Sequence, residues 1–129
     1  MTRTWKSDEL DIVGRAEELE LASLRGDGTL RKPVTVWVVR HGEDLYVRSG
    51  YGRDAAWFRA TQVRREGRIK AGSVERDVVF VDADSALNDQ IDEAYRTKYF
   101  RYGERWIDAT VTPEAQCETI KLLPRSAGR

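Results

Sequence analysis

The feature that most constrains this chain is a run from Val34 to Arg40 that is almost wholly apolar and β-branched. Residues of this kind favour strands, and a strand with one face in water would alternate apolar and polar positions instead. We therefore expect a strand that is covered on both faces. Because successive side chains of a strand point to opposite faces, Val36 and Val38 should share one side. Trp37 and Val39 should share the other.

A hairpin, a second strand and a short helix follow this run. Residues 41–44, His-Gly-Glu-Asp, have the composition of a hairpin connection. The next strand, Leu45–Ser49, alternates, so Tyr46 and Arg48 share a face that either lines a pocket or faces solvent. Asp54 is suited to cap a helix at 55–62. This helix carries Trp57, which either stacks on a planar ligand or packs in the core.

Periodicity predicts one more helix near the start of the chain and four more strands. The first helix covers residues 7–14, with Ser7 as its cap. The strands are expected at 18–24, 68–71, 74–82 and 116–123. The count of about six short strands, mostly joined by short turns, favours antiparallel pairing. Chains of this size that are dominated by strands usually close into a barrel or a sandwich.

The longest helix is expected at 86–100, and it begins after a cap at Asp84 or Ser85. Asp92 and Arg96 are four residues apart and are placed for an ion pair on its surface. Its apolar stripe should pack on the barrel, with Asp89 and Glu93 outward, and consists of Leu87, Ile91, Tyr95 and Tyr99.

Composition excludes several classes of protein. The formal net charge of zero does not favour attraction to nucleic acid or to a membrane surface. Cys117 is the only cysteine, so no intrachain disulfide forms, which is compatible with a cytoplasmic location. His41 has no neighbouring cysteine or histidine that would form a metal site with it. We expect one domain over residues 1–124 and a flexible tail at 125–129.

Three segments carry a family resemblance: DLYVRSGYGRDAAWFRAT at 44–61, RIKAG at 68–72 and the valine-rich strand that follows. They resemble the FMN-binding split-barrel superfamily, in particular its members related to deazaflavin-dependent nitroreductases. NDQIDEAYRTKY at 88–99 and TIKLLPR at 119–125 resemble the bacterial domain-of-unknown-function family 2255, over nearly the whole chain. The resemblance implies an α+β fold that is mainly β, a small antiparallel split β-barrel with flanking helices. It implies no particular reaction.

The superfamily also implies where a cofactor would bind. Its Ser-x-Gly-Gly-type turn corresponds here to Ser49, Gly50 and Gly52, and its aromatic pair to Trp57 and Phe58. The nitroreductase motif Gly-Arg-x-Ser-Gly is absent, and only Gly26, Gly28, Arg31 and Lys32 lie in the corresponding place.

The charge pattern gives independent information. Basic side chains dominate residues 53–76, whereas residues 82–93 carry acids and no base. The phosphate of a flavin or deazaflavin needs arginines and backbone donors, and a turn that precedes a helix supplies both. The alternative is that the arginines are solvated, or pair with the acidic segment of the same chain or of a second subunit.

Two functions of different class remain open. The first is a flavin- or deazaflavin-binding oxidoreductase, with FMN or a deazaflavin as cofactor. In this hypothesis the phosphate is held by Arg31, Lys32 and Arg53, and the turn donates hydrogen bonds from Ser49, Gly50 and Gly52. Trp57 lies near the ring of the cofactor. The pocket is lined by Tyr46 and Arg48. The second is a binding or interaction module that has this fold and no cofactor. No catalytic residue is assigned.

We also expect a homodimer with any cofactor site near the subunit boundary. Split-barrel relatives commonly pair in this way. The sequence adds a reason of its own, because a barrel this small has little interior left for a ring-sized ligand. Aromatic residues are enriched in the buried centres of interfaces. The large aromatics that exceed what one core readily buries are Trp37, Tyr46, Tyr51, Trp57 and Trp106.

Overall fold

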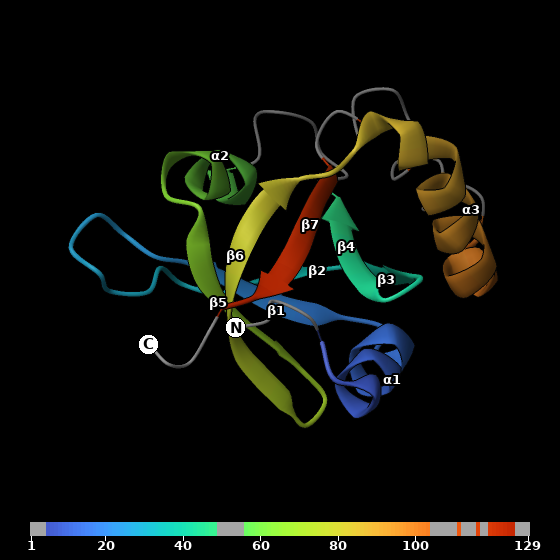
Figure 1. Cartoon of the computed structure of the whole chain (residues 1–129), viewed down its shortest axis with the longest axis horizontal. Helices are drawn as coiled ribbons and strands as arrows, with labels where there is room; N and C mark the ends of the chain where they lie inside the picture. Colours follow the sequence, from blue (N-terminus) through green and yellow to red (C-terminus); the bar gives the residue numbers. More distant parts are fainter. Residues whose placement is uncertain (1–4, 49–55, 104–110, 112–115, 117–118, 126–129) are drawn as a thin grey trace.

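The computed structural model describes residues 5–48, 56–103, 111, 116 and 119–125. Within these residues, seven antiparallel strands form one sheet that curves into a nearly closed barrel, and three α-helices flank it (Figure 1). The predicted split barrel is therefore confirmed, with one strand more than the sequence pattern indicated. No helix in these segments is long and apolar enough to cross a membrane.

The strand order explains how the barrel closes. The order in the sheet is β2-β1-β5-β6-β7-β4-β3, so β2 and β3 lie at its two ends although they follow one another in the chain. Trp37 is the one residue between them. The strands are β1 (Leu19–Ser23), β2 (Val34–Val36), β3 (Val38–His41), β4 (Asp44–Arg48), β5 (Glu66–Ala71), β6 (Val74–Asp82) and β7 (Thr119–Pro124).

The apolar run from Val34 is thus two strands, and the prediction of one continuous strand is wrong. β2 pairs with β1, whereas β3 pairs with β4, so the chain must break at Trp37 to pass from one end of the sheet to the other. The predicted faces are confirmed. Val36 and Val38 lie in the barrel core, and Val39 lies on the opposite face with the half-buried Trp37 packed against its cluster.

The barrel core consists of inward-facing residues from every strand, together with one face of helix α1 (Ser7–Arg15). Leu10 and Val13 are the residues that α1 buries, as its predicted periodicity requires. The N-cap of α1 is Lys6 and not the predicted Ser7, because the Lys6 backbone N–H is satisfied by Glu9 Oε1 at 3.0 Å.

Helix α3 (Asn88–Tyr99) covers the outer face of β3 and β4, and short 3₁₀ turns flank it at η1 (Ser85–Leu87) and η2 (Phe100–Tyr102). Its predicted stripe is confirmed, since Ile91, Tyr95 and Tyr99 have no exposed surface. Asp89 and Glu93 are exposed as expected. Asp84 caps the turn η1 that leads into the helix, since its Oδ1 accepts from the Ala86 N–H at 2.9 Å, whereas the N-cap of α3 itself is Leu87.

Candidate functional site

A cavity of about 280 Å³ lies between β1, the segment before β2 and helix α2 (Ala56–Val63). We call it the β1–α2 pocket. It brings together three of the residues that the sequence singled out, Arg31, Lys32 and Trp57. The remaining lining residues are Leu21, Ser23, Arg25, Val34, Ala56 and Ala60.

The walls of the β1–α2 pocket differ in character. Trp57 is half-buried, packs against the barrel core and meets Phe58 edge to face, with ring centroids 6.2 Å apart. The predicted core packing is therefore confirmed, and because Trp57 also lines the pocket, stacking on a planar ligand stays a prediction. Arg31 and Lys32 are exposed at the rim. The pocket thus offers an aromatic and apolar interior with cationic side chains at its edge.

Ser23, which also lines this pocket, has a polar group without a partner among the described residues. Its side chain is buried, with a relative exposure of 3% for the residue, and its hydroxyl has no hydrogen-bond partner among the described residues. Leaving such a group unsatisfied costs about 1–3 kcal/mol. The hydroxyl is itself closed off from solvent, so a ligand can bond it and recover this cost only after neighbouring side chains move. The sequence did not reveal Ser23 as a site residue, because a serine at the end of a strand gives no sign that its partner is missing.

Hydrogen bonds hold the loop that carries the basic rim. Arg25 Nη1 donates to Leu30 O at 2.8 Å, and Arg31 N donates to Ser23 O at 2.8 Å. Thr29 donates to the Asp27 carboxylate through its hydroxyl and its backbone N–H, and these bonds lower the pKa of Asp27. The loop is therefore ordered before any ligand binds, which reduces the entropy lost on binding.

Helix α2 is tied to the same loop. Arg64 follows the helix, and its Nη1 donates to Arg25 O at 3.0 Å and to Gly26 O at 3.2 Å. Thus the two sides of the β1–α2 pocket, the helix with Trp57 and the loop with Arg31, are held at a fixed separation.

Tyr46 and Arg48 do not belong to this pocket. They share a face of β4 as predicted, but α3 covers that face, and their exposures are 1% and 3%. The predicted alternative of a solvent-exposed face is therefore wrong, and a role of these residues in lining another pocket stays a prediction. The apolar stripe of α3 needs a surface to pack on, and this face of the sheet supplies it.

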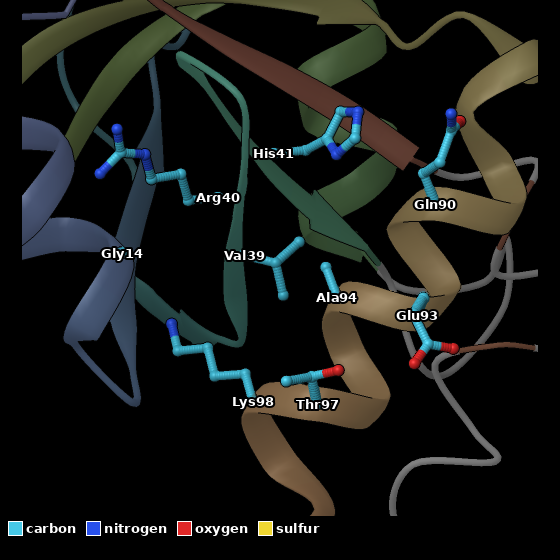
Figure 2. Close-up of a pocket in the computed structure, with 9 residues that line it drawn as sticks. All are labelled: Gly14, Val39, Arg40, His41, Gln90, Glu93, Ala94, Thr97 and Lys98. Atoms are coloured by element: carbon cyan, nitrogen blue, oxygen red, sulfur yellow. The ribbon is translucent and has the colours of Figure 1, made fainter.

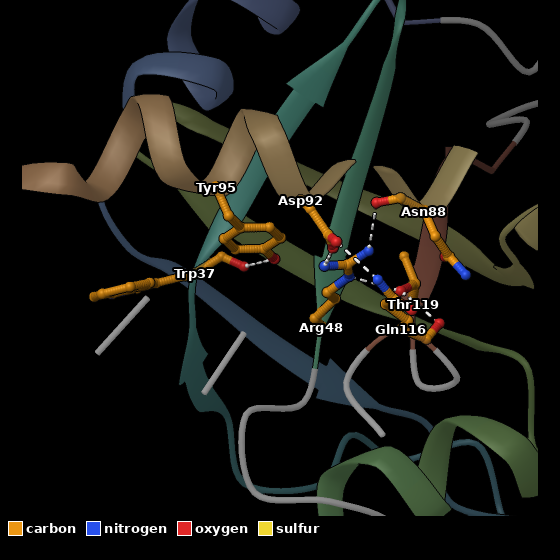
Figure 3. A network of polar contacts seen from close by, with 7 residues as sticks. All are labelled: Trp37, Arg48, Asn88, Asp92, Tyr95, Gln116 and Thr119. Atoms are coloured by element: carbon orange, nitrogen blue, oxygen red, sulfur yellow. Dashed lines mark hydrogen bonds and ion pairs between the residues drawn. The ribbon is translucent and has the colours of Figure 1, made fainter. Parts of the chain in front are cut away.

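Arg48 lies at the centre of a buried polar network (Figure 3). Its Nη1 donates to Asp92 Oδ1 at 2.5 Å, and its Nε donates to Thr119 Oγ1 at 2.8 Å. Gln116 Nε2 donates to the other Asp92 oxygen at 2.7 Å. The predicted surface pair of Asp92 with Arg96 is wrong, since Asp92 is buried and Arg96 is exposed. Arg48 thus fastens α3 and β7 to β4.

The rest of the predicted cofactor turn lies outside the described residues. This applies to Ser49, Gly50, Gly52 and Arg53, which stand in the segment between β4 and α2. Cys117, Tyr51 and Trp106 also lie outside them.

Several cations of the basic stretch 53–76 form ion pairs within the chain. Arg65 pairs with Asp82 at 3.0 Å. This pair joins the basic stretch to the acidic segment of the same chain, which was one of the predicted alternatives to phosphate binding. The other pairs are Arg64–Glu66, Arg68–Asp77 and Arg76–Glu9. These four arginines therefore have structural partners, whereas Arg31 and Lys32 line the pocket.

The sequence was compared with known protein families and with curated proteins. Residues 9–122 match the family described as "Uncharacterized protein conserved in bacteria (DUF2255)". No curated protein matches the sequence.

Solved structures share the fold at low sequence identity. HutZ, the heme storage protein from Vibrio cholerae, is 17% identical with a TM-score of 0.64, over 95% of this chain and 91% of that one. A putative pyridoxamine 5′-phosphate oxidase from Listeria innocua is 16% identical with a TM-score of 0.63, over 92% of both chains. An FAD-binding protein from Mesorhizobium loti is 14% identical with a TM-score of 0.55, over 96% and 92%. At these identities the likeness shows the fold alone.

Proposed function

We propose that this chain, which belongs to the uncharacterised bacterial family matched by residues 9–122, is an oxidoreductase that binds a flavin or deazaflavin in its β1–α2 pocket. The observation that carries the proposal is the meeting of Trp57 and the basic rim in one cavity. Two structural neighbours support it, since one is described as an FAD-binding protein and the other as an F420 reductase.

The residues of the pocket fit the parts of such a cofactor. A flavin ring has apolar faces, which match the apolar interior beside Trp57. Arg31 and Lys32 at the rim suit the phosphate, because guanidinium and ammonium groups form charge-assisted hydrogen bonds with it. When bound, the cofactor supplies the hydride chemistry. The chain contributes binding, orientation and exclusion of water from the ring.

The size of the pocket supports a homodimer as part of this proposal. At about 280 Å³ it lies just below the range of roughly 300–1,000 Å³ that is usual for small-molecule sites. A complete flavin nucleotide would therefore be only partly enclosed by one chain. We propose that a second copy supplies the remaining wall. Leu30, which precedes the basic rim, and Val63, at the end of α2, are exposed large apolar residues that such a copy would cover.

Titration of the purified protein with FMN and with a deazaflavin tests the proposal. Lys32→Met should weaken binding of the preferred cofactor by about 10-fold, the effect of losing one charge-assisted hydrogen bond. Ser23→Ala tests whether the bound cofactor displaces neighbouring side chains to bond this hydroxyl, in which case binding weakens as well. Lys70→Met is the matched control, since Lys70 is exposed on β5 and lines neither side of the pocket. Equal affinity in all four proteins would contradict the proposed site.

One observation favours the second candidate function, a binding module without cofactor. Four arginines of the basic stretch already have carboxylate partners in the chain and need no phosphate. A protein that stays colourless on purification and binds neither FMN nor a deazaflavin at millimolar concentration would support this module and reject the oxidoreductase.

A further inference from the structure

A second cavity of about 510 Å³ lies between strand β3 and helix α3 (Figure 2). We call it the β3–α3 cavity. It shares no lining residue with the β1–α2 pocket, and its volume is within the usual range of small-molecule sites. Nothing in the proposed cofactor chemistry uses it. Its lining includes one amine whose environment is unusual, that of Lys98.

Lys98 is a partly buried amine that forms no ion pair with a carboxylate in the described part of the chain. The side chain is partly buried, and Nζ donates to Val38 O at 2.6 Å and lies 5.0 Å from the centre of the Tyr99 ring. Desolvation lowers the pKa of Lys98 to about 8. Among the described residues, no acidic side chain forms an ion pair with Lys98. An ammonium has three donors, so Nζ can donate to a ligand as well as to Val38.

The other charged groups at this cavity leave Lys98 uncompensated. Arg40 is already paired with Asp11, at 2.9 Å. Glu93 is exposed, and Figure 2 shows the Lys98 side chain reaching toward β3 while the Glu93 carboxylate lies farther from that strand. His41 lies near Gln90, at the other end of the cavity from Lys98 (Figure 2).

The helix spacing fixes the shape of the site. Gln90, Ala94 and Lys98 follow one another at intervals of four residues, so they line one face of α3 over about 12 Å. Ala94 and Val39 belong to the same hydrophobic cluster and form the middle of the cavity. The site is therefore apolar in the middle and cationic at the Lys98 end.

We propose that the β3–α3 cavity binds a small monocarboxylate with an apolar body, whose carboxylate pairs with Lys98. The carboxylate supplies the counter-charge that no described residue provides, in a partly desolvated place where such a pair is stronger than on an open surface. The apolar body covers Val39 and Ala94. The site is independent of the cofactor pocket and of the reaction proposed for it.

Two probes that differ in charge alone test this site. The fluorescent acid 2-naphthoate should bind the full chain, and its neutral isostere 2-naphthamide should bind at least about 10-fold more weakly, because it lacks the charge-assisted hydrogen bond. Lys98→Met should weaken naphthoate binding by a similar factor and leave naphthamide binding unchanged. Lys70→Met makes the same chemical change at an exposed position of β5 and should not alter either affinity.

A second variant tests the cavity apart from the charge. Ala94→Leu fills the apolar middle and keeps Lys98, so it should weaken binding of both probes. If Lys98→Met fails to fold, which circular dichroism would reveal, the Ala94→Leu result still tests whether the probes bind in this cavity. The proposal is overturned if naphthoate does not bind below 10 mM of probe (about 3 kcal/mol of binding energy), if the amide binds as tightly as the acid, or if Ala94→Leu binds both like the wild type.

Discussion

At the scale of single residues, the buried pair of Arg48 and Asp92 is the clearest case of a charge used for structure. The exposed fractions of the two side chains are 0% and 8%. Each charge is therefore costly to bury, and the pair persists because the carboxylate is also held by Gln116 and the guanidinium by Thr119. A residue of this kind can resemble a ligand-binding arginine in the sequence, since only its partner across the fold reveals its role.

Removing one partner of this pair should be severe. We expect Asp92→Ala to lower the free energy of unfolding by about 3–5 kcal/mol, because it leaves the Arg48 charge buried and unpaired. Asp82→Ala is the control, since it breaks the exposed Arg65–Asp82 pair, whose side chains are 42% and 68% exposed. That change should cost about 0–1 kcal/mol. Denaturant melts measure both, and equal losses would contradict a structural role for the buried pair.

Lys98 gives a prediction about pH. Its pKa is lowered from 10.5 to about 8 by desolvation, so between these values the unfolded chain binds more protons than the folded one. Lys98 therefore makes the folded state more stable as pH rises through this window, and less stable as pH falls. His41, Arg40 and Glu93 line the same cavity, and the Tyr99 ring lies beside the amine.

The test of this pH dependence compares the wild type with Lys98→Met, so that other titrating groups cancel. The difference in unfolding free energy between the two proteins should shift in favour of the wild type between pH 8 and pH 10.5 (the window set by the two pKa values). Carbon-13 NMR of the lysine side chains should show one amine titrating near pH 8. A Lys98 midpoint near 10.5 would mean that the amine is solvated.

At the scale of elements, the sequence predicted the helices and strands whose residue pattern lies within the element itself. The bounds of β6, Val74–Asp82, were predicted as observed, because the Gly72-Ser73 turn separates it from β5 and a valine-rich run follows. The break at Trp37 was not predicted, since only the pairing of β2 and β3 with different partners requires it. The face shared by Tyr46 and Arg48 was predicted, but its covering by α3 depends on contacts between distant segments.

The same distinction applies to the candidate site. Arg31, Lys32 and Trp57 could be named because charge and aromatic character are visible in the sequence, and the structure brings them into one pocket. Ser23 could not, because its orphaned hydroxyl is a property of what surrounds it in space.

Helix α3 supplies the prediction at this scale. Ile91 has no exposed surface and packs in the cluster that joins the helix to β3 and β4. Ile91→Ala should therefore lower the free energy of unfolding by about 2–5 kcal/mol, the cost of a large-to-small change in a core. Glu93→Ala, on the exposed face of the same helix, should change it by less than about 0.5 kcal/mol. Denaturant melts that show no difference between the variants would refute the packing of α3.

At the scale of the whole molecule, the end strands β2 and β3 are not paired with each other in the described sheet. The side chain of Tyr99 spans the seam at this edge of the barrel. The Tyr99 hydroxyl accepts from Val38 N at 3.2 Å and lies 2.8 Å from Glu17 O, so it bridges β3 and the segment before β1. Trp37 stacks on the Tyr99 ring, with the centroids 4.0 Å apart. Burial raises the pKa of Tyr99 far above its ordinary value, so the hydroxyl remains a donor at any physiological pH.

Removing this hydroxyl tests whether it closes the barrel. Tyr99→Phe should lower the free energy of unfolding by about 1–3 kcal/mol, because it leaves buried backbone groups of the seam without a partner. Amide hydrogen exchange at Val38 should become faster. Tyr102→Phe removes a hydroxyl that bonds the exposed Glu17 carboxylate, and it should have little effect on either quantity. Unchanged exchange at Val38 in Tyr99→Phe would show that the seam is held by other contacts.

A homodimer is also predicted at this scale, but the structure shows that fewer aromatic residues need an interface than the sequence indicated. Tyr46 is buried within one chain and needs no interface, whereas Trp37 and Trp57 are only half-buried. Leu30 and Val63 are exposed, Val63 to 83%, beside a pocket that is small for a flavin nucleotide. A second copy placed over this region would cover the apolar residues and enclose the cofactor at once.

Val63→Glu tests the dimer without a cost to the single chain, because this side chain is almost wholly exposed in it. Light scattering of the wild type should give twice the 14.8 kDa mass of one chain, and the variant should shift toward the single-chain mass. FMN affinity should fall with the loss of the dimer if the second copy supplies a wall of the site. Ala86→Glu places the same charge at an exposed position beside α3 and should alter neither mass nor affinity. A wild-type mass of 14.8 kDa that added FMN does not change would contradict the dimer and the shared site with it.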